Sequence, residues 1–191
     1  MHVHLTMPEI IIIAVVVAVV IAAIVAYAIY RRKRREELQR RFGSEYDRAV
    51  QAHGSESKAE AALENRRKRV ESLPLRDLDQ AERERFLERW KAVQLAFVDS
   101  PRGALTEADD VVVAAMRARG YPVADFEQRA ADISVDHPRV TENYRAAHAV
   151  DARLRAGQAV TTEDLRTAMI HYRALFDELL QPTVAERRDA A

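Results

Sequence analysis

The sequence predicts an all-α protein with a single N-terminal transmembrane helix, a charged helical stalk and a C-terminal helical bundle. Three observations support this fold class. An uninterrupted apolar run occupies residues 10–30. Much of the chain after it repeats apolar side chains at the three- and four-residue spacing of helices, and the alternating pattern of strands is nearly absent. With 191 residues, the chain can hold one anchor and one small domain.

The apolar run predicts the transmembrane helix. Residues 10–30 contain no charged side chain, and a helix of this length, at about 1.5 Å per residue, matches the roughly 30 Å hydrocarbon layer of a bilayer. Tyr27 and Tyr30 lie at its end, where aromatic rings favour the headgroup zone. A cleaved signal peptide is the alternative, because the triplet AYA at residues 26–28 resembles a cleavage motif. We favour an uncleaved anchor, since the leader, residues 1–9, has no Lys or Arg.

The charges after the run predict its orientation. Five consecutive cations follow it, namely Arg31, Arg32, Lys33, Arg34 and Arg35. Positive residues beside a transmembrane helix stay in the cytoplasm. The sequence therefore predicts a single-pass protein of the cell (inner) membrane with its N-terminus outside and its domain in the cytoplasm. We expect the same cations to contact the anionic lipid headgroups of the bilayer, at about 1 kcal/mol each. The alternative is that they serve only as a topology signal.

A stripe of small side chains runs along the predicted transmembrane helix. It consists of Ala14, Ala18, Ala22 and Ala26, at four-residue intervals. This spacing lets two helices approach closely, which predicts self-association as a homo-oligomer. Chance is the alternative, because alanine is common in apolar spans.

Residues 31–76 predict a basic juxtamembrane segment and a charged helical stalk. In its first part, a narrow apolar stripe at helical spacing consists of Leu38, Phe42, Tyr46 and Ala49 or Val50. Between 57 and 72, only Leu63 and Val70 stand seven residues apart, with charges nearly everywhere else. That second pattern is typical of a solvated helix or a weak coiled-coil arm.

Residues 77–181 predict the bundle, with four main helices and one short helix. The main helices are expected at about 80–98, 103–119, 138–156 and 163–180, and the short one at 126–133. Asp79 and Glu82 form a capping-box pair before the first of them. Gly120 follows the second, at a position that needs a positive φ. Trp90 is expected in the core, although it could also line a ligand pocket, and residues 182–191 form a flexible tail.

Composition excludes several classes of function. Of the 30 basic and 30 acidic residues, 23 and 27 respectively lie in residues 42–191, so the domain is slightly acidic and nucleic-acid binding is not expected. The chain has no cysteine, which excludes disulfides and thiol chemistry. The sequence contains no glycine-rich phosphate loop and none of the common hydrolase motifs. We therefore assign no catalytic residue, no metal ligand and no cofactor.

Asp136 and His137, directly before Pro138, form the pair that most resembles a catalytic site. An Asp beside a His could position an imidazole for proton transfer. The favoured interpretation is structural, with Asp136 or His137 at the start of the helix that begins at Pro138 and the Asp136 side chain as the expected cap.

Four other histidines offer weaker signals. His148 and His171 lie on the last two long predicted helices, where they could face one another and bind a metal together with an Asp or Glu. His2 and His4 could touch a metal outside the cell, but two ligands on a leader make a poor site. We expect ordinary packed or exposed histidines in both cases.

The segment from Arg117 to Pro138 (RARGYPVADFEQRAADISVDHP), with YRAAH at residues 144–148 and FGSEYDRAV at 42–50, resembles an uncharacterised bacterial, actinobacterial family of membrane or secreted proteins. The resemblance implies membrane attachment and a helical domain. Because that family has no known activity, it implies no catalytic residue.

The function that these observations predict is a membrane-anchored cytoplasmic helical module for interaction or scaffolding, without catalytic activity. Its expected partners are the lipid bilayer and another protein. The alternative is a membrane-tethered enzyme or small-ligand sensor that uses the Asp136 and His137 region. An enzyme should have polar groups converging on a pocket there, whereas a scaffold should have a filled core and an exposed apolar or charged groove.

Overall fold

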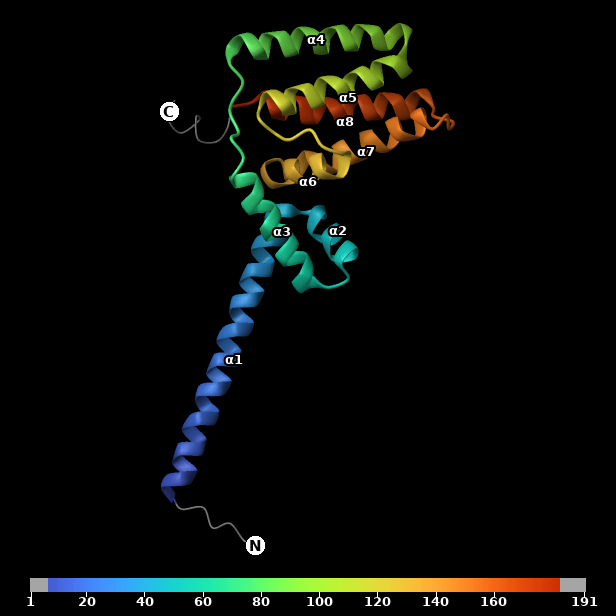
Figure 1. The fold of residues 1–191 in the computed structure, drawn as a ribbon. Coiled ribbons are helices and arrows are strands. Elements are labelled where there is room, and N and C mark those ends of the chain that lie inside the picture. Colours follow the sequence, from blue (N-terminus) through green and yellow to red (C-terminus); the bar gives the residue numbers. More distant parts are fainter. Residues whose placement is uncertain (1–6, 183–191) are drawn as a thin grey trace. The chain divides into compact units, whose positions relative to one another are not determined.

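The computed structural model describes residues 7–182, and within that range it consists of helices joined by short connections, without a strand (Figure 1). The all-α prediction is confirmed. The eight helices are α1 (Met7–Phe42), α2 (Ser44–His53), α3 (Glu56–Glu71), α4 (Gln80–Asp99), α5 (Pro101–Ala118), α6 (Phe126–Asp136), α7 (Pro138–Arg155) and α8 (Thr162–Leu180). They divide into two units, Met1–Arg41 and Phe42–Ala191.

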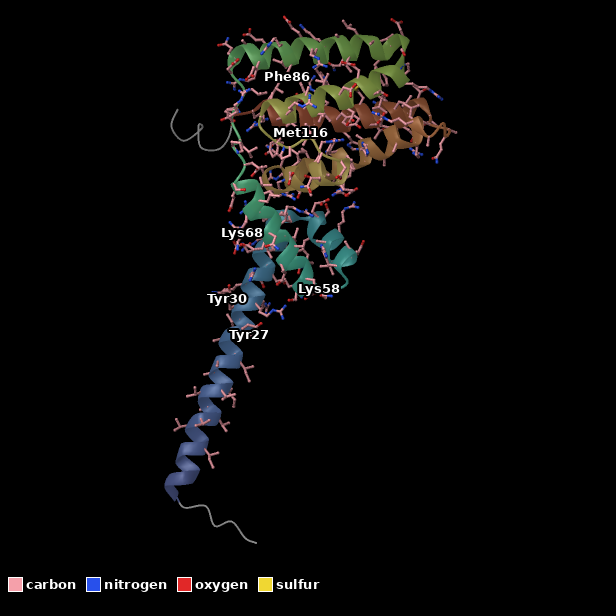
Figure 2. All side chains as sticks on the ribbon, viewed as in Figure 1. Tyr27, Tyr30, Lys58, Lys68, Phe86 and Met116 are labelled. Carbon is pink, nitrogen blue, oxygen red and sulfur yellow. The ribbon has the colours of Figure 1, made fainter. Side chains whose placement is uncertain are left out.

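The first unit contains the candidate membrane helix. From Val15 onward, α1 is long and apolar enough to cross a membrane by length and composition, a test that a signal sequence near the N-terminus also passes. The apolar side chains that the structure describes between residues 13 and 30 are exposed, among them Tyr27 and Tyr30, which Figure 2 labels. The helix continues without a break through the five cations of residues 31–35. A bilayer would cover this continuous apolar surface, which is otherwise exposed to water.

Of the predicted alanine stripe, Ala18, Ala22 and Ala26 are exposed. The side chain of Ala14 lies outside the described residues, as do His2 and His4. Whether the stripe pairs two helices stays a prediction.

The second unit begins at Phe42, so it includes α2 and α3, which the sequence placed in a solvated stalk. Phe42, Tyr46 and Leu63 are almost completely buried. These two helices pack against each other, and they also contact α7 and α6 respectively. The few apolar side chains of α2 and α3 are enough to form a core, because the two helices bury them against each other. Polar contacts then join both helices to the rest of the unit. The domain boundary expected near residue 77 is therefore not a boundary of the compact unit.

Helices α4 to α8 occur where the sequence predicts them, with ends that differ by at most a few residues. In Figure 1, α4 packs on α5, α5 on α8, α8 on α7 and α7 on α6. Aromatic side chains fill the space between them. The rings of Trp90 and Phe176 stack with centroids 4.6 Å apart, and Trp90 is 1 % exposed. Trp90 is thus a core residue, as expected, while Phe86 and Phe97 on the same helix are only partly buried.

Local signals in the sequence explain several helix ends. Asp79 and Glu82 form the predicted capping box at the start of α4, and Thr161 and Asp164 form another at the start of α8. Gly120 has a φ of 95°. A Cβ at this position would lie 2.7 Å from the carbonyl oxygen of Pro74, so both the backbone conformation and the space require glycine.

Candidate functional site

Asp136 does not cap α7. Helix α6 continues to Asp136, and His137 occupies the N-cap position of α7 without a side-chain hydrogen bond to the helix. The Asp136 carboxylate instead accepts a hydrogen bond of 2.7 Å from the Tyr121 hydroxyl. The capping prediction is wrong because α6 takes Asp136 into its last turn, which aims the side chain at Tyr121. Pro138 at the first turn of α7 agrees with the prediction.

His137 has a different partner from Asp136. Its Nδ1 lies 3.5 Å from Oε1 of Glu178 on α8, close enough for an ion pair but outside hydrogen-bond geometry. Burial lowers the pKa of His137, and the neighbouring Glu178 only partly opposes that effect. The two residues thus engage different partners, and the structure does not bring them together as an acid–base pair.

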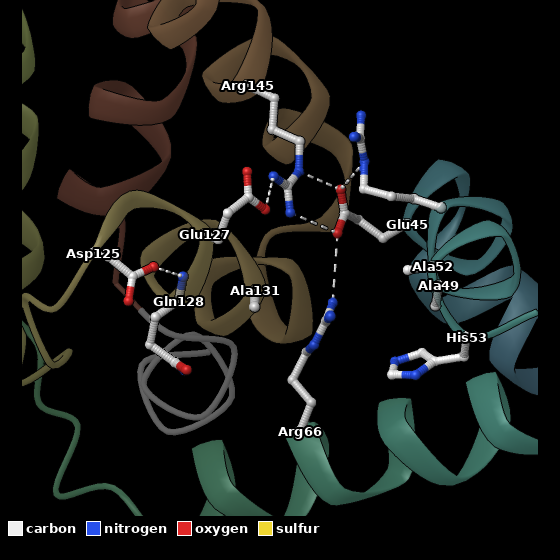
Figure 3. Close-up of a pocket in the computed structure, with 11 residues that line it drawn as sticks. Glu45, Ala49, Ala52, His53, Arg66, Asp125, Glu127, Gln128, Ala131 and Arg145 are labelled. Atoms are coloured by element: carbon white, nitrogen blue, oxygen red, sulfur yellow. Dashed lines mark hydrogen bonds and ion pairs between the residues drawn. The ribbon is translucent and has the colours of Figure 1, made fainter.

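A charged cleft lies between α2, α3, α6 and α7 (Figure 3). It has a volume of about 460 Å³. Its charged lining consists of Glu45, Arg48, Arg66, Asp125, Glu127 and Arg145. The name charged cleft is used below for the depression that these six residues line.

Glu45 is the centre of the charged cleft and is only 2 % exposed. Its carboxylate accepts hydrogen bonds from Arg145 at 2.6 and 3.2 Å and from Arg66 at 3.4 Å. Arg48 adds an ion pair at 3.4 Å. Arg145 also donates to Glu127 at 2.6 Å. One buried carboxylate thus holds three guanidinium groups from three helices.

Three guanidinium groups surround the single Glu45 carboxylate, and burial together with this excess of positive charge affects the pKa of Arg66. Burial lowers the pKa of Arg66. The nearby guanidinium groups of Arg145 and Arg69 lower it further, whereas the Glu45 carboxylate opposes these effects. This network could not be predicted from the sequence, because Glu45 and Arg145 are 100 residues apart. A pairwise charge pattern over that distance is not visible in one sequence.

A second depression, of about 590 Å³, adjoins the charged cleft and shares Arg48, Glu127 and Arg145 with it. His148 on α7 forms part of its wall. The His148 ring stacks on Phe126, with centroids 3.6 Å apart and an interplanar angle of 9°. This contact fixes the plane of the imidazole.

His148 belongs to a cluster with two aspartates, Asp109 on α5 and Asp151 on α7. One ligand-type atom from each of the three residues lies within 4.8 Å of the other two. Asp151 is fully buried and accepts hydrogen bonds from Arg155 Nε at 2.6 Å and from the Thr106 hydroxyl at 3.3 Å. We call Asp109, His148 and Asp151 the Asp–His–Asp cluster.

Burial shifts the pKa of two members of this cluster. It raises the pKa of Asp109, although His148 and Arg129 partly compensate. It lowers the pKa of His148 despite the two nearby aspartates. Both shifts have the same physical cause, since a low-dielectric surrounding disfavours the charged form.

Two polar atoms of the cluster have no hydrogen-bond partner within the described part of the chain. They are Oδ1 of Asp109 and Nδ1 of His148. Tyr172 is completely buried on α8. Its pKa is raised by burial and by the nearby Asp109 and Asp151 carboxylates. The hydroxyl therefore lies beside the cluster.

The less favoured alternative, in which His148 shares a site with an acidic residue, resembles this cluster, but the second histidine of that alternative, His171, is not one of its members. Asp151 stands three residues after His148 on the same helix, which is the signal that could have identified the pair. Asp109 comes from a different helix, so no local sequence pattern predicts that it belongs to the cluster.

Comparisons with protein families, with characterised proteins and with solved structures gave no significant match. The resemblance to a bacterial membrane or secreted family stays a prediction.

Proposed function

We propose that the protein is a single-pass protein of the cell (inner) membrane whose helical domain binds another protein in the cytoplasm and catalyses no reaction. The exposed apolar length of α1 supports membrane insertion. The cations Arg31–Arg35 support a cytoplasmic domain and contact with anionic headgroups. A reporter fused after the last residue should therefore be active in the cytoplasm, and activity outside would overturn the orientation.

The observation that carries the proposal is the charged cleft in a domain whose core is filled. The largest buried side chains, such as Trp90, Tyr144 and Phe176, are almost inaccessible to solvent. The charged cleft, in contrast, presents fixed charges of both signs on the surface (Figure 3). Arginine is enriched in protein interfaces because its planar group forms several directed hydrogen bonds.

Arg48 is the residue that a partner would meet first. Its side chain is 57 % exposed, whereas that of Arg145 is 9 % exposed. Arg48 has only a 3.4 Å ion pair to the shared Glu45 carboxylate. We therefore expect the partner to present an acidic side chain to Arg48, at the mouth of the charged cleft.

Site-specific photo-crosslinking tests this proposal in cells. A photoreactive amino acid at Ala52, which lines the cleft, should give a discrete crosslinked product, and the same residue at exposed Ala96 on α4 serves as the matched control. The product should disappear when Arg48→Glu is added, while the variant keeps its helical content and membrane location. Equal products at both positions, or no effect of Arg48→Glu, would overturn the proposed interface. A product of twice the chain's own mass would instead identify a homo-oligomer.

The alternative of an enzyme or sensor at Asp136 and His137 has less support. Tyr121 engages the carboxylate and Glu178 lies against the imidazole, so neither group is directed at a shared reactant.

A further inference from the structure

We propose that Asp109, His148 and Asp151 bind one divalent first-row transition-metal ion, such as Zn²⁺ or Mn²⁺. This inference goes beyond the proposed interaction function and does not depend on it. The ion would join α5 to α7 inside the second unit.

The types of ligand determine the class of metal. An imidazole nitrogen favours first-row transition ions over Mg²⁺ and Ca²⁺, which prefer an all-oxygen shell. Two carboxylates with one imidazole form a set that Zn²⁺ and Mn²⁺ both accept. Metal–ligand bonds are about 2.0–2.2 Å long, so two ligands on opposite sides of an ion lie up to about 4.4 Å apart. The three ligand atoms lie within 4.8 Å of one another, and small side-chain rotations would bring them to bonding distance.

The unpartnered atoms are a second and independent indication of a ligand. Asp109 is only 5 % exposed, yet its Oδ1 has no hydrogen-bond partner within residues 7–182. Nδ1 of His148 is in the same condition, whereas the Tyr172 hydroxyl lies against the Asp109 carboxylate and interacts with it. Buried polar atoms in folded proteins are nearly always satisfied. A cation bound to the Asp109 carboxylate and to His148 would satisfy both unpartnered atoms, directly or through a bound water.

Arg155 is a competing cation, and it holds Asp151 more closely than Asp109. Its Nε binds Oδ2 of Asp151 at 2.6 Å, and its Nη2 stays 3.8 Å from Oδ2 of Asp109. The Arg155 side chain is 55 % exposed, so it approaches from the solvent side. It can remain on Asp151 as an outer partner of a ligating carboxylate, an arrangement that is common around bound metals.

His148 is the member of the cluster that also forms part of the wall of the depression adjoining the charged cleft. The imidazole is therefore the ligand that a solvent ion would meet first. The stacked Phe126 ring keeps the imidazole in one plane, which lowers the entropy that binding must remove.

Metal content and metal-dependent stability test the proposal on the full-length protein in detergent. After treatment with EDTA and removal of the chelator, ZnCl₂ or MnCl₂ should restore one ion per chain, measured by inductively coupled plasma mass spectrometry. The same ion should raise the melting temperature by about 5–10 °C at a hundred times its dissociation constant. MgCl₂ at the same concentration should produce a much smaller shift.

The variants separate this site from surface binding. Asp109→Asn and His148→Gln should each abolish the shift and the bound ion, whereas the controls Asp110→Asn and His171→Gln should retain both. Asp110 is the exposed neighbour of Asp109, and His171 lies on α8 outside the cluster. If Asp109→Asn fails to fold, His148→Gln still decides the matter. The proposal would be overturned if neither ion changed the melting temperature of the wild-type protein. It would also be overturned if the shift survived in both cluster variants. Metal content and the crosslink at Ala52 are separate measurements, so a protein without a bound ion that still gives the crosslink would overturn only the metal proposal.

Discussion

Removing the Glu45 carboxylate should destabilise the second unit substantially, because α2 and α3 belong to it. Glu45→Ala leaves Arg66 and Arg145 without the anion that both contact. Breaking a fully buried ion pair by removing one partner costs about 3–5 kcal/mol. Arg66 and Arg145 retain some contact with solvent, at 19 % and 9 % side-chain exposure, and Arg145 keeps Glu127. We therefore expect the low end, about 3 kcal/mol.

The matched control is Arg48→Ala, which removes the exposed member of the same network. An ion pair with one exposed partner contributes about 0–1 kcal/mol, so this variant should melt within a few degrees of wild type. For a chain of this size, about 3 kcal/mol corresponds to a fall of roughly 6–12 °C in melting temperature. Thermal unfolding followed by circular dichroism at 222 nm distinguishes the two variants.

A double-mutant cycle then locates the interaction. Glu45→Ala combined with Arg145→Ala should cost less than the sum of the two single variants, by at least about 1 kcal/mol, because the residues act as a pair. If Glu45→Ala melts like wild type, then α2 does not pack in the second unit, and the solvated stalk predicted from the sequence would be correct after all.

Substitutions at three further positions test other parts of the molecule. Trp90→Ala should cost about 3–5 kcal/mol, since the indole is 1 % exposed and stacks on Phe176; an unchanged urea midpoint would place Trp90 outside the core. Asp136→Asn retains an acceptor for the Tyr121 hydroxyl and should be nearly neutral, whereas Asp136→Ala should cost about 1 kcal/mol; equal melting temperatures for the two would mean that this hydrogen bond does not contribute. Burial lowers the pKa of His137 in the folded state, so the unfolded chain binds a proton more readily, and stability should be complete above about pH 6.5 and fall as the pH decreases below it. His137→Gln should therefore reduce the loss of melting temperature between pH 7.5 and 5.5, and an undiminished loss would assign the pH dependence to other groups.

Local patterns in the sequence predicted much of the helical framework. The capping box at Asp79 and Glu82 and the positive φ at Gly120 both occur as expected, because each depends on a few consecutive residues. The apolar spacing in residues 80–180 likewise depends on one helix at a time. These signals are complete within a single turn or a single helix, so one sequence is enough to identify them.

The features that the sequence did not predict all depend on distant partners. Leu63 had only Val70 as an apolar companion on its predicted helix, yet it is fully buried, because neighbouring helices supply the rest of the apolar surface. Asp136 had the right residue type for an N-cap, but the alternative acceptor role for Tyr121 depends on how α6 ends. No local propensity determines which of two competing hydrogen bonds a carboxylate makes.

Helix α7 connects the two candidate sites in one rigid element. Arg145 extends from it into the charged cleft, and His148, three residues later, forms the wall of the adjoining depression and part of the Asp–His–Asp cluster. Residues at this spacing lie on one face of a helix. A metal ion that joins α5 to α7 would therefore hold the element that positions Arg145 against Glu45. The geometry of the charged cleft would then depend on groups that never contact a partner, and its rigidity would come from the buried side of the same helix.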